Sequence, residues 1–376
     1  MPDINTLPVA PTVRQPRGAV KLGGTTITSW VSWEVDSNVF RSADTFRVVF
    51  ALNDLPVARD AAWIASQKSI DVQIYGTAIP TDPANYTPVE ADLQIYGEVD
   101  DVDYNPAEGT IELTGRDLTA KLIDTKTSEN FSNQTASQIA STLAGRHGLR
   151  AEVTATKTRV GQYYTADHVD LSQEQSEWEL LVKLADYEDF DVFVTGQTLH
   201  FQPKPSAGVN RYAIVWTPTN DDVDYPEANS TTLKFTRSLT IAKGITVEVR
   251  SWNSKQKKAF TATYPKAASR TRPGQSAAKT TPYRRTIAGL TQDQATQRAK
   301  QLYDQIVQHM VKLDADLPAD DLLDCTKTLV VRGTGTAFDQ VYFPDSVKRT
   351  MSMVEGYRMS VSAKNVSDDV AGAAAA

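Results

Sequence analysis

The sequence lacks the residues and segments that would indicate a disulfide-stabilised, membrane-bound or secreted protein. It has one cysteine in 376 residues, so no disulfide can form within the chain, and we interpret Cys325 as a small apolar core residue. No hydrophobic run approaches the roughly 20 residues that a membrane-spanning helix needs, so no membrane insertion is expected. The first residues form neither a basic segment nor an apolar stretch, which predicts no secretory signal and folding in a reducing cytoplasm.

Catalytic and cofactor motifs are also missing. The sequence has no H-E-x-x-H, G-x-S-x-G or P-loop pattern. It has four histidines, which are far apart in the chain: His147, His168, His200 and His309. His147 follows a predicted helix, where the helix dipole favours a histidine without any catalytic role. We therefore expect no catalytic, metal-binding or cofactor-binding residues, no cofactor and no enzymatic activity.

The net charge of −7 argues against a general attraction to nucleic acid or to anionic membranes. The charge is uneven, because the segment from Lys255 to Arg285 has nine basic residues and no acidic one. The rest of the chain therefore carries about −16. Residues 255–285 also contain prolines and lack apolar periodicity, so we predict a basic arm that becomes ordered against an acidic surface on assembly.

The first third of the chain is predicted to be antiparallel β-structure. Apolar and polar residues alternate over residues 70–74, which is typical of a half-buried strand. Residues 45–50 and 110–114 are rich in β-branched and aromatic residues. Turn-forming residues at 105–109 separate two such runs, which favours a sheet or barrel of short strands.

The middle of the chain changes to a mixed pattern. Ala136, Ile139, Ala140 and Leu143 share one helical face, with Ser132 or Asn133 as the candidate cap and Gly148 at the end. Ser176 and Glu179 fit a capping box that begins a second helix, on which Trp178 is expected to be a core residue. Residues 190–201 then alternate around a Thr-Gly-Gln turn as a hairpin. This pattern predicts a small α+β unit.

The last third returns to strands at residues 245–249, 328–331 and 357–361. A capping box at Thr291–Gln294 starts a helix that we expect over 291–313. Residues 367–376 are expected to be a disordered tail.

Three segments in this order resemble the phage late control protein D and baseplate hub family of contractile tails. They are residues 115–124 (GRDLTAKLID), residues 176–201 (with SEWELL, DVFV and TLHF) and residues 333–357 (with GTGTAFDQ, DSV and EGY). The resemblance implies a β-rich α+β fold with two tail-tube-like antiparallel β-barrel domains and an α+β insertion. It places the first barrel at 1–118, with 206–237 as its candidate completion, the insertion at 119–205, and the second barrel at 238–366.

The same resemblance implies a structural baseplate hub without activity of its own. Such a hub is a homotrimer whose six barrels form a pseudo-sixfold ring between the hexameric tail tube and the trimeric spike. DNA would pass through its channel without specific binding, and tape-measure and other baseplate proteins are further expected partners. The protein would lie in the virion tail baseplate and be assembled in the bacterial host cytoplasm. Because the chain stops soon after Asn365, the spike is expected to be a separate protein.

Two other functions are compatible with parts of the sequence. A hub of a tailocin or a secretion-type injection particle would have the same fold, and neighbouring capsid or terminase genes would separate the two. A peptidoglycan-cleaving tail enzyme would need a general acid and a second carboxylate in a cleft. No segment resembles such a hydrolase.

Three short motifs each have a functional and a structural interpretation. The acidic runs 100–104 and 221–225 could bind a metal or repel DNA from a channel, but they lack a calcium-loop pattern, and a solvated face is the simpler interpretation. Gly333-Thr334-Gly335 lacks the third glycine and the helix of a nucleotide-binding turn, and a β-turn before a strand at 338–343 is favoured. Arg116 and Asp117 are expected to be a structural ion pair rather than a catalytic one.

Overall fold

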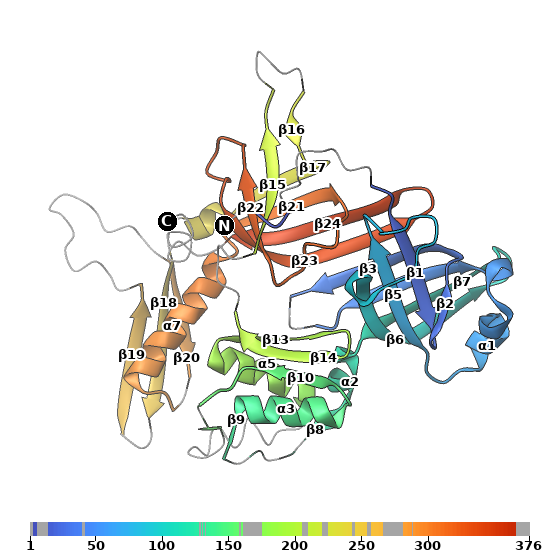
Figure 1. Cartoon of the computed structure of the whole chain (residues 1–376). Coiled ribbons are helices and arrows are strands. Elements are labelled where there is room, and N and C mark those ends of the chain that lie inside the picture. Colours follow the sequence, from blue (N-terminus) through green and yellow to red (C-terminus); the bar gives the residue numbers. More distant parts are fainter. Residues whose placement is uncertain are drawn as a thin grey trace.

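The computed structural model describes residues 3–5, 14–39, 42–127, 129, 131, 133–157, 159–160, 175–204, 210–219, 225–242, 245–253, 257–265, 281–287 and 289–365. The chain is mostly β-structure, as the sequence predicted, and most of its strands join one large sheet (Figure 1). None of the described helices is long and apolar enough to cross a membrane.

The first strand group comes from the N-terminal part of the chain. Its strands are β1 (Arg17–Leu22), β2 (Thr25–Ile27), β3 (Trp30–Asn38), β4 (Thr45–Ala51), β5 (Asp71–Thr77), β6 (Leu93–Asn105) and β7 (Thr110–Asp117). A short helix, α1 (Ala61–Ser66), and three 3-10 turns, η1 (Leu52–Asp54), η2 (Val57–Arg59) and η3 (Glu90–Asp92), lie in its connections.

The second strand group comes mostly from the C-terminal part. Its strands are β15 (Arg211–Thr217), β16 (Glu227–Ala228), β17 (Thr232–Arg237), β21 (Val311–Pro318), β22 (Thr328–Arg332), β23 (Val341–Ser352) and β24 (Gly356–Asn365). β15 pairs with β22, and β17 pairs with β21, so the strands within 206–237 belong to this group and do not complete the first one as expected. Antiparallel pairing of β3 with β23 joins both groups into one 14-stranded sheet.

The two groups repeat one strand order. The first has the order β3-β4-β7-β6-β5, the second has β17-β21-β24-β23-β22, and every neighbouring pair in both is antiparallel. The order of the strands along the chain is also the same in both. They differ at the next strand, because β1 is antiparallel to β5 whereas β15 is parallel to β22. The chain therefore contains an internal structural repeat of five strands.

Both groups share one hydrophobic core, and the β3–β23 junction lies over it. Trp33 of β3 is 2% exposed and fills the space beside Gly76 of β5. A Cβ atom at Gly76 would lie 2.7 Å from the Trp33 ring, so the indole needs a glycine there. Burial of such a large aromatic side chain contributes strongly to the stability of a core.

The α+β unit follows β7 and has its own core. It consists of α2 (Thr119–Asp124), β8 (Lys126–Thr127), β9 (Gln134–Thr135), α3 (Ala136–Arg146), β10 (Arg150–Val153), β11 (Arg159–Val160), β12 (Gln175–Ser176), α5 (Glu177–Glu188), β13 (Phe190–Thr195) and β14 (Thr198–Pro203). The capping box at Ser176–Glu179, the 190–201 hairpin and the buried Trp178 are confirmed. The cap of α3 is Thr135, because its hydroxyl accepts the Gln138 N–H, and not Ser132 or Asn133.

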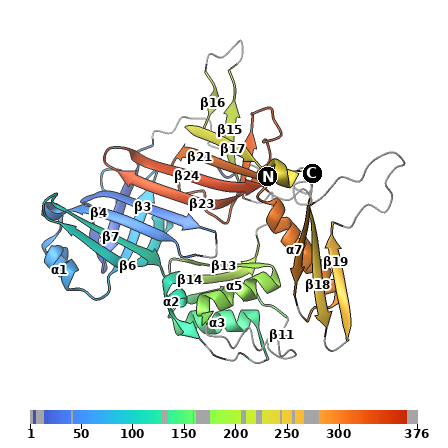
Figure 2. The same ribbon diagram turned by 180° about the vertical axis from the view of Figure 1, so that it is seen from behind.

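A third unit is inserted in the sequence between β17 and β21 and lies beside the α+β unit, apart from the large sheet (Figures 1 and 2). It contains α6 (Leu239–Ala242), a separate sheet of β18 (Ile245–Asn253), β19 (Lys258–Tyr264) and β20 (Thr281–Thr286), and helix α7 (Gln292–Val307), which packs on β18 and β19. Residues 238–366 are therefore not one unit, because this sheet with its own core interrupts them. The described parts of the predicted arm contain β19 and the start of β20, while residues 255–256 and 266–280 lie outside the described residues, as does the 367–376 tail.

Helix α7 begins at the predicted capping box but ends at Val307. The predicted end at Leu313 is wrong, because that residue lies on β21. Residues 311–318 alternate strictly between buried and exposed, and pairing with β17 and β24 satisfies their backbone groups in place of further helical turns.

Candidate functional surface

One face of the large sheet points away from the core and is polar. It runs across eight neighbouring strands, β17-β21-β24-β23-β3-β4-β7-β6. Burial alternates along them, as in β21 and β24, so that every second side chain lies on this face. Its charged residues are Lys234, Lys312, Lys348, Lys364, Arg47, Arg116, Arg358, Glu34, Asp36, Glu98, Asp100, Asp101, Asp103, Glu112, Asp314, Asp316 and Asp345.

Many of these charges are paired with one another across the strands. Lys348 lies 2.6 Å from Glu34 across the junction of the two groups, and Lys364 lies 2.6 Å from Asp345. Arg47 forms a forked pair with Glu112. A cation that is held by a neighbouring carboxylate is less available to a phosphate, so this face is poorly suited to holding nucleic acid tightly.

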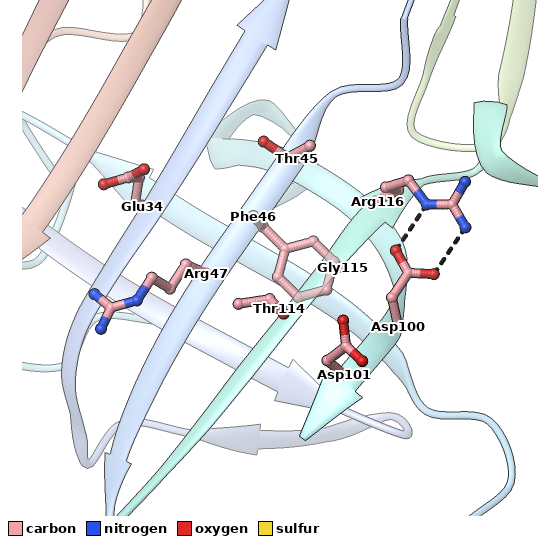
Figure 3. Close-up of a pocket in the computed structure, with 9 residues that line it drawn as sticks. All are labelled: Glu34, Thr45, Phe46, Arg47, Asp100, Asp101, Thr114, Gly115 and Arg116. Atoms are coloured by element: carbon pink, nitrogen blue, oxygen red, sulfur yellow. Dashed lines mark hydrogen bonds and ion pairs between the residues drawn. The ribbon is translucent and has the colours of Figure 1, made fainter. Parts of the chain in front are cut away.

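An open depression of ≈ 340 Å³ lies on this face in the first strand group (Figure 3). Its lining residues are Glu34, Thr45, Phe46, Arg47, Asp100, Asp101, Thr114, Gly115 and Arg116. Figure 3 shows Arg116 joined to Asp100 at one side, through hydrogen bonds of 2.7 and 2.9 Å. The lining has no nucleophile held by a base, so the arrangement offers charge pairing rather than acid–base chemistry.

Arg116 does not pair with Asp117, so that expectation is wrong. Strand alternation points the two side chains to opposite faces of β7. Arg116 instead binds Asp100 on β6 and Asp124 on α2, and both carboxylates raise its pKa. Lys121 of α2 likewise lies 2.7 Å from Glu98 of β6. These pairs join the α+β unit to the sheet, which is the structural role that the sequence suggested for Arg116.

Asp117 turns into the core beside Asp44, a pair that sequence reasoning missed. Asp117 accepts hydrogen bonds from the Thr119 backbone N–H (3.2 Å) and hydroxyl (2.8 Å). Burial raises its pKa well above the usual range, and the nearby Asp44 raises it further. Burial also raises the pKa of Asp44 to about 6, although the Asn38 N–H donates to it at 2.8 Å. No sequence motif marks this pair, because strand pairing creates the proximity.

A second missed cluster lies in the α+β unit around Glu177, which is fully buried at the start of α5. Arg146 binds Glu177 and also Glu129 (2.6 Å), while His147 Nε2 lies 2.5 Å from the second Glu177 oxygen. The buried carboxylate is therefore matched by two groups from the end of α3. His147 is the C-cap residue of that helix, as predicted.

The other histidines do not gather into a site. His200 stacks on Phe193 at 4.6 Å between ring centroids and lies 3.2 Å from Glu152, and burial lowers its pKa. His309 lies between α7 and β21, and burial also lowers its pKa. His168 lies outside the described residues.

The acidic run 100–104 lies on β6 with exposed side chains, as a solvated face requires. Most of the second run, 221–224, lies outside the described residues. Within the part of the chain that the structure describes, no three His, Cys, Asp or Glu side chains are grouped as metal ligands. The geometry gives no support for a metal at the first run.

Gly333 and Gly335 have φ of +92° and +66° and lie in the connection from β22 to β23. Asp339 holds this turn by accepting hydrogen bonds from the Thr334 hydroxyl (2.6 Å) and the Gly335 N–H (3.0 Å). These residues connect two strands, as expected, but the β-turn lies at Thr336–Asp339, where the Asp339 N–H donates to the Thr336 carbonyl at 3.1 Å, and the strand begins at Val341 rather than at 338.

Cys325 is partly buried, and its thiol donates to the Ser37 carbonyl at 3.4 Å. Burial raises the pKa of the thiol, which keeps it protonated and unreactive. Cys325 also packs against the shared core, which confirms its interpretation as an apolar filler.

Comparisons with known proteins match the fold but not the sequence. No protein-family model and no curated protein sequence matches the chain. A tail protein from Neisseria meningitidis MC58 has a TM-score of 0.66 at 15% identity, covering 96% of this chain and 99% of its own. The 43 kDa tail protein of prophage MuSo2 from Shewanella oneidensis has a TM-score of 0.64 at 16% identity, covering 93% and 98%.

A third similar structure comes from a secretion system. An Escherichia coli component of the type VI secretion system, itself similar to the T4 bacteriophage tail proteins gp27 and gp5, has a TM-score of 0.53 at 12% identity and covers 93% of this chain and 77% of its own. These matches span nearly the whole chain. This chain therefore has the fold of phage tail proteins and of the related type VI secretion component, as its resemblance to the baseplate hub family predicted.

Proposed function

We propose that this protein is the structural baseplate hub of a contractile phage tail, a homotrimer that joins a hexameric tail tube to a trimeric spike. The observation that carries the proposal is the repeat of five strands within one sheet. A chain with two equivalent strand groups can present six near-equivalent positions when three copies assemble around an axis. That arrangement would adapt a sixfold partner to a threefold one.

Each strand group is proposed to be one tail-tube-like barrel. In both groups, five antiparallel strands are followed by a further strand, β1 or β15, at the same edge. The strands bury one face in the shared core and leave the other face polar. The tail proteins of similar fold support this assignment, and the type VI component supports the same coarse role as part of a tail or spike assembly.

The polar face is proposed to line the channel through which DNA passes. Its arginines and lysines are largely held by carboxylates, as in the Arg116 and Lys348 pairs. A lining of paired charges would neither hold nor strongly repel the phosphates of passing DNA. The β6–β7 and β23–β24 turns lie at one rim of the sheet, and the α+β unit and the β18–β20 unit leave it at the opposite rim. These two units are proposed to bind spike, tape-measure and baseplate proteins.

The test is the size and shape of the purified protein at assembly concentrations. Light scattering should give about three times 41.3 kDa, and electron micrographs should show rings with a central opening. Adding purified tube protein should cap one rim of the ring. A chain that stays monomeric, also after tube and spike proteins are added, would contradict the proposal.

The hub is proposed to have no enzymatic activity. The depression in Figure 3 carries three carboxylates, and Arg116 holds one of them, Asp100, in an ion pair, which favours its charged form over that of a general acid. Purified protein should therefore clear a peptidoglycan suspension no faster than a heat-inactivated sample. Faster clearing would favour the peptidoglycan-cleaving alternative.

A further inference from the structure

The two strand groups meet where β23 pairs with β3, and the internal repeat has a second, corresponding pair of edges that are not joined within the described residues. Within the chain, β23 pairs with β3 along Ser346–Ser352, the half nearest its hairpin turn. β6 has the corresponding place in the first group, and its turn-proximal residues 100–105 pair with β7 alone. β17, which corresponds to β3, pairs with β21 alone. Both strands thus have an unpaired edge with respect to the described residues.

We propose that these two edges pair with each other between neighbouring copies, so that β17 of one copy adds antiparallel to residues 100–105 of β6 in the next. The inference rests on the proposed trimeric hub and assigns its subunit interface. Unpaired edge N–H and C=O groups readily accept a further strand, and such an addition forms regular main-chain hydrogen bonds. The intrachain β23–β3 pairing provides the geometric template.

The template also fixes the register. Asn105 and Ser352 are the last residues before the two hairpin turns, so counting back makes Asp101 correspond to Lys348. From Asp101, the pairings across β7 and β4 lead to Glu34 of β3, and from Lys348 those across β24 and β21 lead to Thr232 of β17. Glu34 and Thr232 therefore correspond, and two residues further along so do Asp36 and Lys234. Lys348 is directly opposite Asp36 in the chain. Asp101 should therefore lie directly opposite Lys234 of the neighbouring copy.

The side chains on the polar face are complementary in this register. Asp101 and Lys234 are both exposed, and no described residue forms an ion pair with either. Their intrachain counterparts, Lys348 and Asp36, lie directly opposite each other and carry the same two charges with the signs exchanged. Lys348 also binds Glu34, the next residue of β3 on the same face. Opposite charges directly across two strands stabilise a pairing, whereas like charges oppose it.

The side chains on the core face are complementary as well. Val102 and Tyr104 of β6 point to the same face as the buried Leu113 and Ile111, yet they are 41% and 56% exposed. Leu233 and Phe235 of β17 are half-buried on the corresponding face. Pairing would therefore continue the hydrophobic core from one copy into the next, as Trp33 and Met351 do inside the chain.

Such an interface is head-to-tail, because each copy uses a different edge on each side. A head-to-tail contact forms a closed ring when its rotation divides a full turn. Each copy would contribute its eight strands from β17 to β6, so the polar face would continue without interruption around the channel. No edge of these eight strands would remain exposed.

Charge exchange at this pair gives the first test. Asp101→Lys and Lys234→Asp should each weaken trimer formation roughly tenfold or more, because each places like charges opposite one another. The double variant Asp101→Lys/Lys234→Asp should restore assembly. Lys312→Asp, an exposed charge on the inner strand β21, is the matched control and should leave the trimer unchanged. Circular dichroism on the monomers would show that each variant is folded.

Cross-linking gives the second test. In the proposed register Asp103 is opposite Thr232 of the neighbour, so Asp103→Cys/Thr232→Cys should form an intermolecular disulfide on oxidation. Non-reducing gels should show covalent trimers. Asp103→Cys/Ser360→Cys, in which the second cysteine lies two strands farther away on β24, should not cross-link.

The outcomes separate this inference from the proposed function. A trimeric wild type that tolerates both charge reversals and gives no disulfide would overturn the β6–β17 interface and leave the hub proposal standing. A wild type that is monomeric in every mixture would overturn the hub itself.

Discussion

The two strand groups have the same topology but fill their cores in opposite ways. In the first group, Phe46 of β4 lies opposite Gly115 of β7, and a Cβ atom at Gly115 would lie 2.6 Å from the Phe46 ring. In the second group, the corresponding neighbours are Ala315 of β21 and Val361 of β24, so the smaller residue lies on the strand that corresponds to β4. The first group pairs a large side chain with a residue that has none, and the second pairs a small side chain with a medium-sized one. Both arrangements fill the space between the two strands. The comparison teaches that the repeat preserves strand order and volume rather than residue identity.

A second difference concerns what each group leaves open. The junction at β3 and β23 is closed inside the chain, whereas the counterpart edges of β6 and β17 have no further strand beside them among the described residues. Residues at the closed junction should therefore matter for the folding of a single copy. Residues at the open edges should matter for assembly.

The largest expected effect is at the closed junction. Trp33→Ala should lower the free energy of unfolding by about 3–5 kcal/mol, because it removes a buried indole and leaves a cavity. Tyr104→Ala, at the open edge, should cost a single copy less than about 0.5 kcal/mol. Urea unfolding at a concentration where the protein is monomeric measures both values. Equal losses would show that the two junctions do not differ as proposed.

The next effect concerns the Phe46–Gly115 packing. Gly115→Ala should cost about 2 kcal/mol, since its Cβ would also lie 2.1 Å from the Glu98 carbonyl oxygen. Gly145→Ala in helix α3 has no atom within 4 Å and should instead stabilise the protein by about 0.5–1 kcal/mol. Thermal unfolding compares the two variants. A harmless Gly115→Ala would mean that β6 and β7 can separate there.

A smaller effect is the pH dependence that comes from the Asp44–Asp117 pair of the first group. Asp44 and Asp117 both have raised pKa values in the folded protein, so folding takes up protons there. The stability that this pair contributes is greatest below pH 3.8, and the part from Asp44 is lost as the pH rises to about 6. Asp44→Asn should remove much of this fall and increase stability at pH 7 by about 2 kcal/mol.

Denaturant unfolding between pH 4 and 7 checks this prediction. Asp124→Asn, an exposed carboxylate on α2, serves as the control and should keep the wild-type slope. A steeper fall in the Asp44→Asn variant would show that the carboxylate is stabilising rather than destabilising when charged.

The smallest effect is at the ion pair over the closed junction. Lys348→Ala should cost about 0.5 kcal/mol, because Lys348 and Glu34 are both partly exposed and solvent screens their attraction. The loss should shrink in 1 M salt. A loss as large as that of Trp33→Ala would mean that charge, rather than core packing, holds the two groups together.

The sequence by itself determined the local elements, and its resemblance to a known family predicted the fold. The capping boxes at Ser176 and Thr291 begin helices because their hydroxyls satisfy backbone N–H groups within four residues, and alternation over 70–74 placed β5. Such signals depend on neighbours in the chain, so they can be seen without the fold. The resemblance of three segments predicted the tail-protein fold that the structural comparisons then matched.

Only the tertiary structure decided which strands are neighbours. Single residues do not reveal the five-strand repeat, since Phe46 with Gly115 and Ala315 with Val361 fill the same place with different chemistry. The end of α7, the Asp44–Asp117 pair and the open edges of β6 and β17 depend on pairings between residues far apart in the chain. A strand's partner is set by how its whole face is buried, which no local pattern can specify.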